Sequence, residues 1–267
     1  MAQARRRLGT KKVGHSGTLD PGATGVLLLG VGRATRLLKL LTALPKSYTC
    51  EIVLGTSTST LDDSGVVIAT SDMAGVTLDQ ARAATASLTG DILQVPPMVS
   101  AVKVGGRRLH ELAREGIEVE RAARPVTVHR FHVDAGPAPG VLTAEVDCSS
   151  GTYVRTLAAD LGALLGGGAH LRALRRTAIG PFDVGRARPL AEAELLPPAA
   201  AVAFLDHVEV GGDVAELVRR GRRLRRSGEE VGFPGAGPWA VLDGATGGLL
   251  AVYRAGGDLA VPDVVLA

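Results

Sequence analysis

The sequence predicts an α+β fold with a mainly antiparallel sheet, followed by a small β-rich module. Residues 126–133 and 141–148 alternate apolar and polar side chains, as half-buried antiparallel strands do. The order of helix-like and strand-like stretches departs from the strict β-α-β rhythm of a doubly wound parallel sheet. The run Leu-Pro-Pro-Ala-Ala-Ala at 196–201 is typical of a linker, and a segment of about 60 residues follows it.

Composition indicates a globular protein with a polyanionic partner. The chain has 267 residues, of which 46% are hydrophobic and 21% charged, so it can bury a core and is not disordered. Net charge is only +3, but the pI is about 9.1 and much of the basic charge is clustered. Cys50 and Cys148 stand far apart without a Cys/His cluster, so we expect no disulfide framework and no metal site.

The first half of the chain begins with a glycine-rich loop at 14–25, and we expect a buried strand over 26–31 after it. An amphipathic helix is predicted over 34–44, and a strand over 46–54. Thr77 and Gln80 have the spacing of a helix capping box. Residues 98–114 read as a short strand, a Gly-Gly hairpin turn and a basic helix.

The second half contains a helix predicted over 157–165 and the arginine-rich stretch 170–182. Beyond the linker we expect a helix over 214–220 and three short strands around 239–243, 249–254 and 259–265. Six of the eight residues at 219–226 are arginine, which is more than a solvated face needs. This cluster therefore predicts contact with nucleic acid.

The loop at 14–25 presents a constrained carboxylate. Its sequence is G-H-S-G-T-L-D-P-G-A-T-G, with four glycines that allow positive φ and close approach to a ligand. Pro21 pushes Asp20 out of the α region and into an extended conformation. Ordinary turn chemistry would explain the same residues, so the loop alone does not establish a function.

A second constellation is C-S-S-G-T-Y-V-R-T at 148–156, where a strand ends and a helix begins. If residues 152–155 are still extended, Tyr153 and Arg155 point to one face. A phenol can stack on a base, and a guanidinium can fork onto a carboxylate or phosphate. Tyr48, near the start of the strand 46–54, would by itself be a routine strand aromatic.

Several common catalytic motifs do not occur in the sequence. It contains no G-x-x-x-x-G-K-[ST] loop and no G-x-G-x-x-G after a first strand, so the opening glycines are not a nucleotide-binding loop of either kind. The pair Asp62-Asp63 sits in a polar loop and fits turn chemistry better than an acid/base dyad. No apolar run approaches a membrane span, and we expect a cytoplasmic protein.

Taken together, four motifs resemble the TruB family, the bacterial tRNA pseudouridine-55 synthases. They are the loop at 14–25, K-S-Y at 46–48, V-P-P-M-V-S-A-V-K-V-G-G-R-R-L-H-E-L-A-R-E-G at 95–116 and C-S-S-G-T-Y-V-R-T-L-A-A-D-L-G at 148–162. The resemblance runs in order from about residue 5 to residue 182. It implies a pseudouridine synthase fold: a mixed, mainly antiparallel sheet with flanking helices and a thumb-like insertion.

The resemblance also implies a division of the chain. Residues 1–205 would form the catalytic domain, with the insertion at about 96–127, and residues 206–267 a PUA-like RNA-binding domain. Members usually begin with a strand that carries a Lys-Pro pair, and this sequence starts inside the helix that follows. We therefore expect either a misassigned start codon or a shortened N-terminus.

Roles for single residues follow from the same resemblance. Asp20 matches the catalytic nucleophile, Tyr48 the active-site tyrosine that stacks on the target base and has been proposed as a proton acceptor, and Arg155 the arginine that pairs with the nucleophile. Asp62 is a candidate counterpart of a further acid. The expected substrate-binding residues are His15, Tyr153, Leu174, Lys103, Arg107 and Arg108, followed by Arg114, Arg172, Arg175 and Arg176 as phosphate contacts.

The expected reaction is the isomerisation of uridine to pseudouridine at position 55 in the T arm of tRNA, with the base flipped out. It needs no cofactor and no metal, and we expect a monomer without an obligate protein partner. A non-catalytic chaperone that holds the tRNA is an alternative. A glycoside-type hydrolase is a weaker one, because it needs a second carboxylate, and only Asp62 or Asp63 could supply it.

Overall fold

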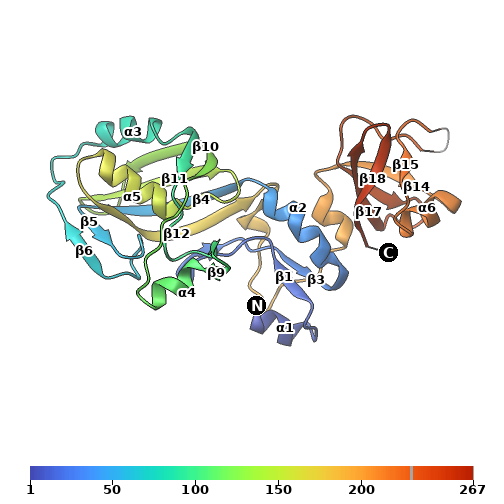
Figure 1. Ribbon diagram of the computed structural model, residues 1–267, viewed down its shortest axis with the longest axis horizontal. Coiled ribbons are helices and arrows are strands. Elements are labelled where there is room, and N and C mark those ends of the chain that lie inside the picture. Colours follow the sequence, from blue (N-terminus) through green and yellow to red (C-terminus); the bar gives the residue numbers. More distant parts are fainter. Residues whose placement is uncertain (229–230, 267) are drawn as a thin grey trace. The chain divides into compact units, whose positions relative to one another are not determined.

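The computed structural model describes residues 1–228 and 231–266, which group into two compact units (Figure 1). Unit 1 combines Met1–Thr18, Leu27–Thr42 and the described part of Ala187–Ala267. Unit 2 combines Leu19–Val26 with Ala43–Arg186. The chain therefore leaves unit 1 for a short segment, which contains Asp20, and returns to it before entering the main part of unit 2.

Unit 2 is built on a seven-stranded sheet in which the neighbouring strands of the main path are antiparallel. Its order is β13 (Phe182–Asp183), β12 (Ala169–Ile179), β4 (Lys46–Leu54), β11 (Val141–Cys148), β10 (Arg124–Ala135) and β7 (Gly90–Gln94). The short strand β2 (Thr24–Gly25) joins β12 in parallel. The predicted mainly antiparallel sheet is confirmed, and β4 and β11 have the predicted bounds.

Two helices cover one face of this sheet, α3 (Leu78–Ala86) and α5 (Val154–Leu164) (Figure 1). Alternate strand residues such as Ile52, Val128 and Val146 pack against Leu157 and Leu161 of α5 in the main core of the unit. Burying these aliphatic side chains supplies the chief driving force for the unit. The predicted capping box of α3 is present, with Thr77 and Gln80 bonding reciprocally. Cys50 and Cys148 are free and buried.

The insertion contains a small hairpin and a helix, as predicted. Strands β8 (Lys103–Val104) and β9 (Arg107–Arg108) are joined by Gly105 and Gly106, whose φ values of 57° and 85° suit the tight hairpin turn that two glycines allow. Helix α4 (Leu109–Arg114) follows directly. A second hairpin in unit 2 pairs β5 (Thr56–Thr58) with β6 (Val67–Thr70), and the short 3-10 helix η2 (Val184–Arg186) ends the unit.

Unit 1 contains a five-stranded sheet of order β14 (Asp206–Val210), β16 (Trp239–Asp243), β17 (Leu249–Gly256), β18 (Leu259–Val265) and β15 (Leu224–Arg225). The remaining elements are α1 (Ala2–Arg7), β1 (Val13–His15), β3 (Leu29–Val31), η1 (Gly32–Leu37), η3 (Pro198–Val202) and α6 (Gly212–Arg219), with α2 (Leu38–Ala43) crossing the boundary between the units. Leu37 and Val202 pack with Val252 in one core, and Trp239 and Tyr253 lie in another.

Three local predictions are wrong in part. Only Leu29–Val31 of the predicted strand 26–31 is a strand, and Leu27 is exposed, because this stretch passes from one unit to the other. The predicted helix 34–44 divides into a 3-10 turn and a short α-helix. The predicted linker 196–201 contains a 3-10 helix whose Val202 is fully buried, so this segment is packed against the sheet.

The compact units do not coincide with the predicted division at residue 205, since residues 1–18 and 27–42 group with the C-terminal sheet. The division into a catalytic domain and a PUA-like domain stays a prediction. Among the described residues, no helix is long and apolar enough to cross a membrane.

Candidate active site

The loop that carries Asp20 is fixed at its far end. Gly25 pairs with Arg176 of β12, and the Val26 amide donates to the Arg176 carbonyl at 2.9 Å. Gly25 has φ 102°, and a Cβ placed there would lie 2.1 Å from that carbonyl oxygen. Only glycine therefore fits this approach of loop to strand. Near Asp20 itself the Ala23 amide donates to the Asp20 carbonyl at 2.9 Å, which closes a turn over Pro21.

Arg155 lies against the Asp20 carboxylate through two contacts. Its Nη2 donates to Asp20 Oδ1 at 3.1 Å, and its Nε lies 2.8 Å from Oδ2 in an ion pair whose N–H is not aligned for a hydrogen bond. The Arg155 side chain is only 4% exposed, whereas that of Asp20 is 36% exposed. A buried cation thus holds a carboxylate that remains accessible from outside.

The same guanidinium binds two further loops of unit 2. Its Nη1 donates to the Thr60 carbonyl and its Nη2 to the Val99 carbonyl, both at 2.9 Å. Its Nε also lies 3.5 Å from Asp62 Oδ2. Arg155 therefore connects the Asp20 loop, the loop after β5 and the entrance of the insertion.

Asp62 is held as an anion beside this cluster. Burial by itself would raise the pKa of Asp62, but hydrogen bonds from Ser64 and Thr60 and the charge of Arg155 outweigh burial, so the pKa lies below its usual value. Leu61, between Thr60 and Asp62, has φ 62°, in the left-handed region that a leucine rarely adopts. The loop is strained where it meets Arg155, which is common at functional sites.

Tyr48 lies on β4, directly opposite Arg176 of β12. Burial raises the pKa of the Tyr48 hydroxyl, and a hydrogen bond from Arg176 opposes that rise without cancelling it. Asp20 is close enough for its charge to add to the increase. The phenol is consequently neutral at neutral pH and lies in the same region as the Asp20–Arg155 pair.

Tyr153 and Arg155 are not on one face of a strand, contrary to the expectation for residues 152–155. Tyr153 is extended, with φ −102° and ψ 107°, but α5 begins at Val154 and Arg155 lies in its first turn. The buried side chain of Gln94 fixes this elbow: the Tyr153 amide donates to Gln94 Oε1 at 2.7 Å, and Gln94 Nε2 donates to the Tyr153 carbonyl at 3.1 Å.

The other predicted substrate-binding residues lie on β12, on the β8–β9 hairpin and in unit 1. Leu174 of β12 is partly buried against the core that also contacts Tyr48. Lys103, Arg107 and Arg108 are exposed on the β8–β9 hairpin, where Arg107 forms an ion pair with Glu115. His15 belongs to unit 1, and its Nδ1 accepts a hydrogen bond from the Gly17 amide at 3.3 Å.

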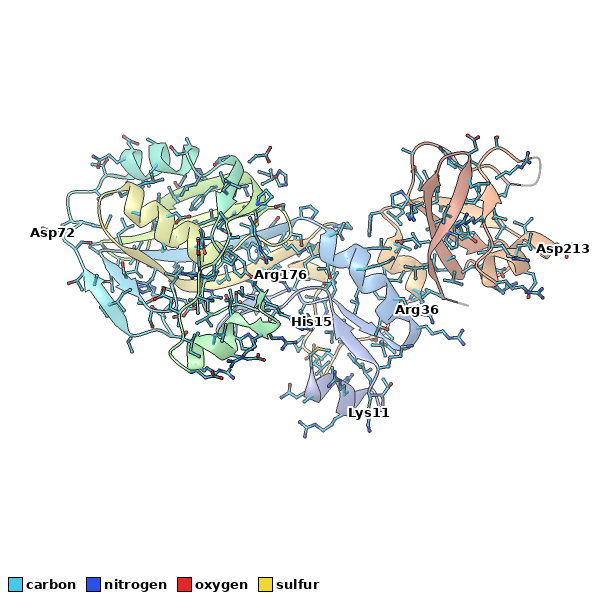
Figure 2. The ribbon with its side chains drawn as sticks, viewed as in Figure 1. Lys11, His15, Arg36, Asp72, Arg176 and Asp213 are labelled. Carbon is cyan, nitrogen blue, oxygen red and sulfur yellow. The ribbon has the colours of Figure 1, made fainter. Side chains whose placement is uncertain are left out.

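Arg176 corrects one sequence expectation. The sequence predicts Arg176 as a phosphate contact beside Arg172 and Arg175. Those two are exposed, but Arg176 is only 1% exposed and lies in the interior of unit 2 (Figure 2). The motifs predicted neither the burial of Arg176 nor any role for Gln94. In the described part of the chain, no group of His, Cys, Asp and Glu has the arrangement of a metal site.

Comparison with known proteins decides the family. The N-terminal domain of TruB family pseudouridylate synthases matches residues 5–154, more than half of the chain. The chain belongs to the TruB family of pseudouridylate synthases. The C-terminal domain of tRNA pseudouridylate synthase B matches residues 155–196 of this TruB family member.

Relatives match this TruB family member over most of its length. A tRNA pseudouridine synthase B of Rhodococcus jostii is 49% identical over 253 residues, which cover 91% of this chain and 81% of the relative. A tRNA pseudouridine synthase B of an Arthrobacter species is 46% identical and covers 100% of this chain and 91% of the relative.

Solved structures support the fold. A Cbf5–Nop10–Gar1 complex contains a chain with a TM-score of 0.71 at 24% identity, and an H/ACA ribonucleoprotein bound to a substrate RNA contains one with a TM-score of 0.69 at 22% identity. Both matches cover 100% of this chain and 80% of the other. The TruB family member thus has the predicted pseudouridine synthase fold.

Proposed function

We propose that this protein converts uridine to pseudouridine at position 55 in the T arm of tRNA, with Asp20 as the nucleophile. The observation that carries the proposal is the pairing of the accessible Asp20 carboxylate with the buried Arg155 guanidinium. The buried guanidinium fixes the orientation of the Asp20 carboxylate, whose oxygen atoms would serve as the nucleophile. The relatives named tRNA pseudouridine synthase B supply the substrate class.

The reaction is an isomerisation, so atoms and electrons balance within the nucleotide. The bond between C1′ and N1 of the uridine breaks with the help of Asp20, the uracil turns, and a bond between C1′ and C5 forms. The proton on C5 is then lost and N1 gains one. Whether Asp20 attacks the sugar or the base, its carboxylate must face the target nucleotide, and its 36% exposure allows this.

Tyr48 supplies a neutral aromatic ring beside the nucleophile. Because burial raises the pKa of its hydroxyl, little phenolate exists at neutral pH, and stacking on the flipped base is the role that suits it best. Tyr153 and Leu174 are the proposed further walls of the base pocket. His15 is the proposed contact for the nucleotides around it.

The exposed hairpin residues Lys103, Arg107 and Arg108 are the proposed phosphate contacts. A uridine inside a folded arm must leave its stack, which costs a few kcal/mol, and phosphate contacts can offset that cost. We further propose that the protein works as a cytoplasmic monomer, and that residues 206–267 form a PUA-like domain that adds RNA contacts.

The test measures pseudouridine formed in a tRNA transcript under single-turnover conditions. We expect Asp20→Asn to lower the rate by more than about 10⁴-fold while tRNA binding persists. The matched control is Asp72→Asn, a carboxylate on an exposed loop at the edge of unit 2 (Figure 2), which should react at the wild-type rate. Equal rates for Asp20→Asn and wild type would refute the nucleophile. Salt-sensitive tRNA binding without any product in the wild type would favour the chaperone alternative.

A further inference from the structure

Arg176 connects the two pieces of chain that carry Asp20 and Tyr48. It is the direct cross-strand neighbour of Tyr48, and its side chain donates a hydrogen bond to the Tyr48 hydroxyl. On its other side the same residue pairs with Gly25, the last residue of the Asp20 loop in strand conformation. One residue therefore contacts both the phenol and the end of the nucleophile loop.

The contacts with the loop involve side chain and backbone together. Arg176 Nε donates to the Val26 carbonyl at 2.8 Å, while the Arg176 carbonyl accepts from the Val26 amide at 2.9 Å. The guanidinium is nearly inaccessible, at 1% exposure, so phosphate binding is not its role. A buried arginine is costly unless its donors are satisfied, and these acceptors help to satisfy them.

Resting on the function proposed above, we propose that Arg176 is a positioning residue for the reaction, because it holds the Tyr48 hydroxyl and the end of the Asp20 loop in a fixed relation. The planar guanidinium offers donors in two directions at once, which a lysine ammonium on a flexible stem does not reproduce. Loss of this link would let the phenol and the carboxylate shift separately, and a misplacement of about 1 Å can cost about 10²-fold in rate.

The test is a double-mutant cycle on the single-turnover rate with wild type, Arg176→Lys, Tyr48→Phe and the double variant. We expect Arg176→Lys to lower the rate by about 10²-fold and to change the dissociation constant for tRNA by less than about threefold. If Arg176 acts through the phenol, the double variant should lose about tenfold less than the product of the two single losses. A purely structural role would give a double variant whose loss of rate equals the product of the two single losses.

Arg130→Lys is the matched control, because Arg130 is an exposed arginine on β10 paired with Glu145 and Asp147; its rate should equal that of wild type. Thermal unfolding identifies variants that do not fold, and Arg176→Gln then replaces Arg176→Lys. Failure of both to fold, a wild-type rate for Arg176→Lys, or multiplying losses would each overturn the inference. An inactive wild type would instead overturn the proposed function, so the two failures are distinguishable.

Discussion

Arg155 and Asp20 meet through two separate contacts, Nη2 to Oδ1 at 3.1 Å and Nε to Oδ2 at 2.8 Å. The arginine is buried in the first turn of α5, and the carboxylate lies on a loop from a distant part of the sequence. Because the same guanidinium also binds the Thr60 and Val99 carbonyls, the geometry at Asp20 depends on three loops being in place.

Arg155→Met should be destabilising as well as inactive. It would leave Asp20 and Asp62 without their cation and the Thr60 and Val99 carbonyls without a donor, and each carbonyl left unsatisfied away from water costs about 1–3 kcal/mol. Arg155→Lys retains a positive charge but not the planar set of donors. We therefore expect an unfolding free energy between those of wild type and Arg155→Met, with a loss of rate of at least about 10²-fold. Urea unfolding together with single-turnover rates measures both effects. Wild-type stability in Arg155→Met would contradict the assigned contacts.

Gln94→Met tests the elbow at Tyr153. Both backbone bonds to Tyr153 would be lost inside the protein, which predicts a loss of about 1–3 kcal/mol in unfolding free energy and a lower rate. Gln80→Met is a matched control, because it removes a glutamine that bonds to backbone at the start of α3, away from the site. The control should lose stability but retain its rate once folded. Equal rates for the two variants would argue against a positional effect of Gln94.

Gly25→Ala should weaken the attachment of the Asp20 loop to β12. The new Cβ would lie 2.1 Å from the Arg176 carbonyl oxygen, and the positive φ adds strain, so we expect a loss of about 2 kcal/mol or more together with a slower reaction. Gly22→Ala in the same loop provides the comparison, since a Cβ there meets no atom within 4 Å. Calorimetry should show a lower stability for Gly25→Ala than for Gly22→Ala, and the tRNA assay should show a slower reaction.

Lys46 predicts a pH dependence of stability. Burial, and next the nearby charge of Arg176, lower its pKa from 10.5 to about 8. Between pH 8 and 10.5 the unfolded chain holds a proton that the folded protein has lost, so the stability of wild type relative to Lys46→Met should rise with pH by roughly 3 kcal/mol over that window. Below pH 8 the difference should be constant. Urea titrations at several pH values check this, with Lys11→Met as the exposed control. A stability difference between wild type and Lys46→Met that stays the same from below pH 8 to pH 10.5 would contradict the prediction.

Lys103→Ala tests the proposed phosphate contacts. If this exposed lysine neutralises one phosphate, the slope of log K against log salt for tRNA binding should fall by about 1 while the rate at saturation stays the same. Arg82→Ala, on α3 and paired with Asp134, removes a cation elsewhere on unit 2 and should leave the slope unchanged. Equal slopes for Lys103→Ala and wild type would exclude the contact.

Local signals in the sequence predicted much of the fold. The alternation along 141–148 and the β-branched content of 46–54 predicted β11 and β4, and the Gly105-Gly106 pair predicted the hairpin. Each of these signals lies within the element that it predicts. The strand expected at 26–31 was wrong over residues 26–28, because the chain passes from one unit to the other there and no local pattern indicates such a passage.

The motifs predicted one contact of the candidate site and did not predict the contacts made by Arg176 and Gln94. Asp20 and Arg155 were expected to pair, and they do. The burial of Arg176 could not be predicted from its own segment, because it depends on Gly25 and Tyr48, which lie on the neighbouring strands β2 and β4. Gln94 carries no motif of its own, and its role arises only where β7 meets the start of α5. The roles assigned to the remaining substrate-binding residues stay predictions.

The segmented make-up of unit 1 limits how this enzyme can be dissected. Residues 1–18 and 27–42 flank the Asp20 segment in the chain but belong with the C-terminal sheet. A fragment that ends at residue 186 would retain Leu37 and delete Val202 and Val252, against which it packs. Unit 2 by itself therefore cannot be obtained with one cut by a protease or one stop codon. It would have to be engineered by rejoining residues 19–26 to 43–186 through a new connection.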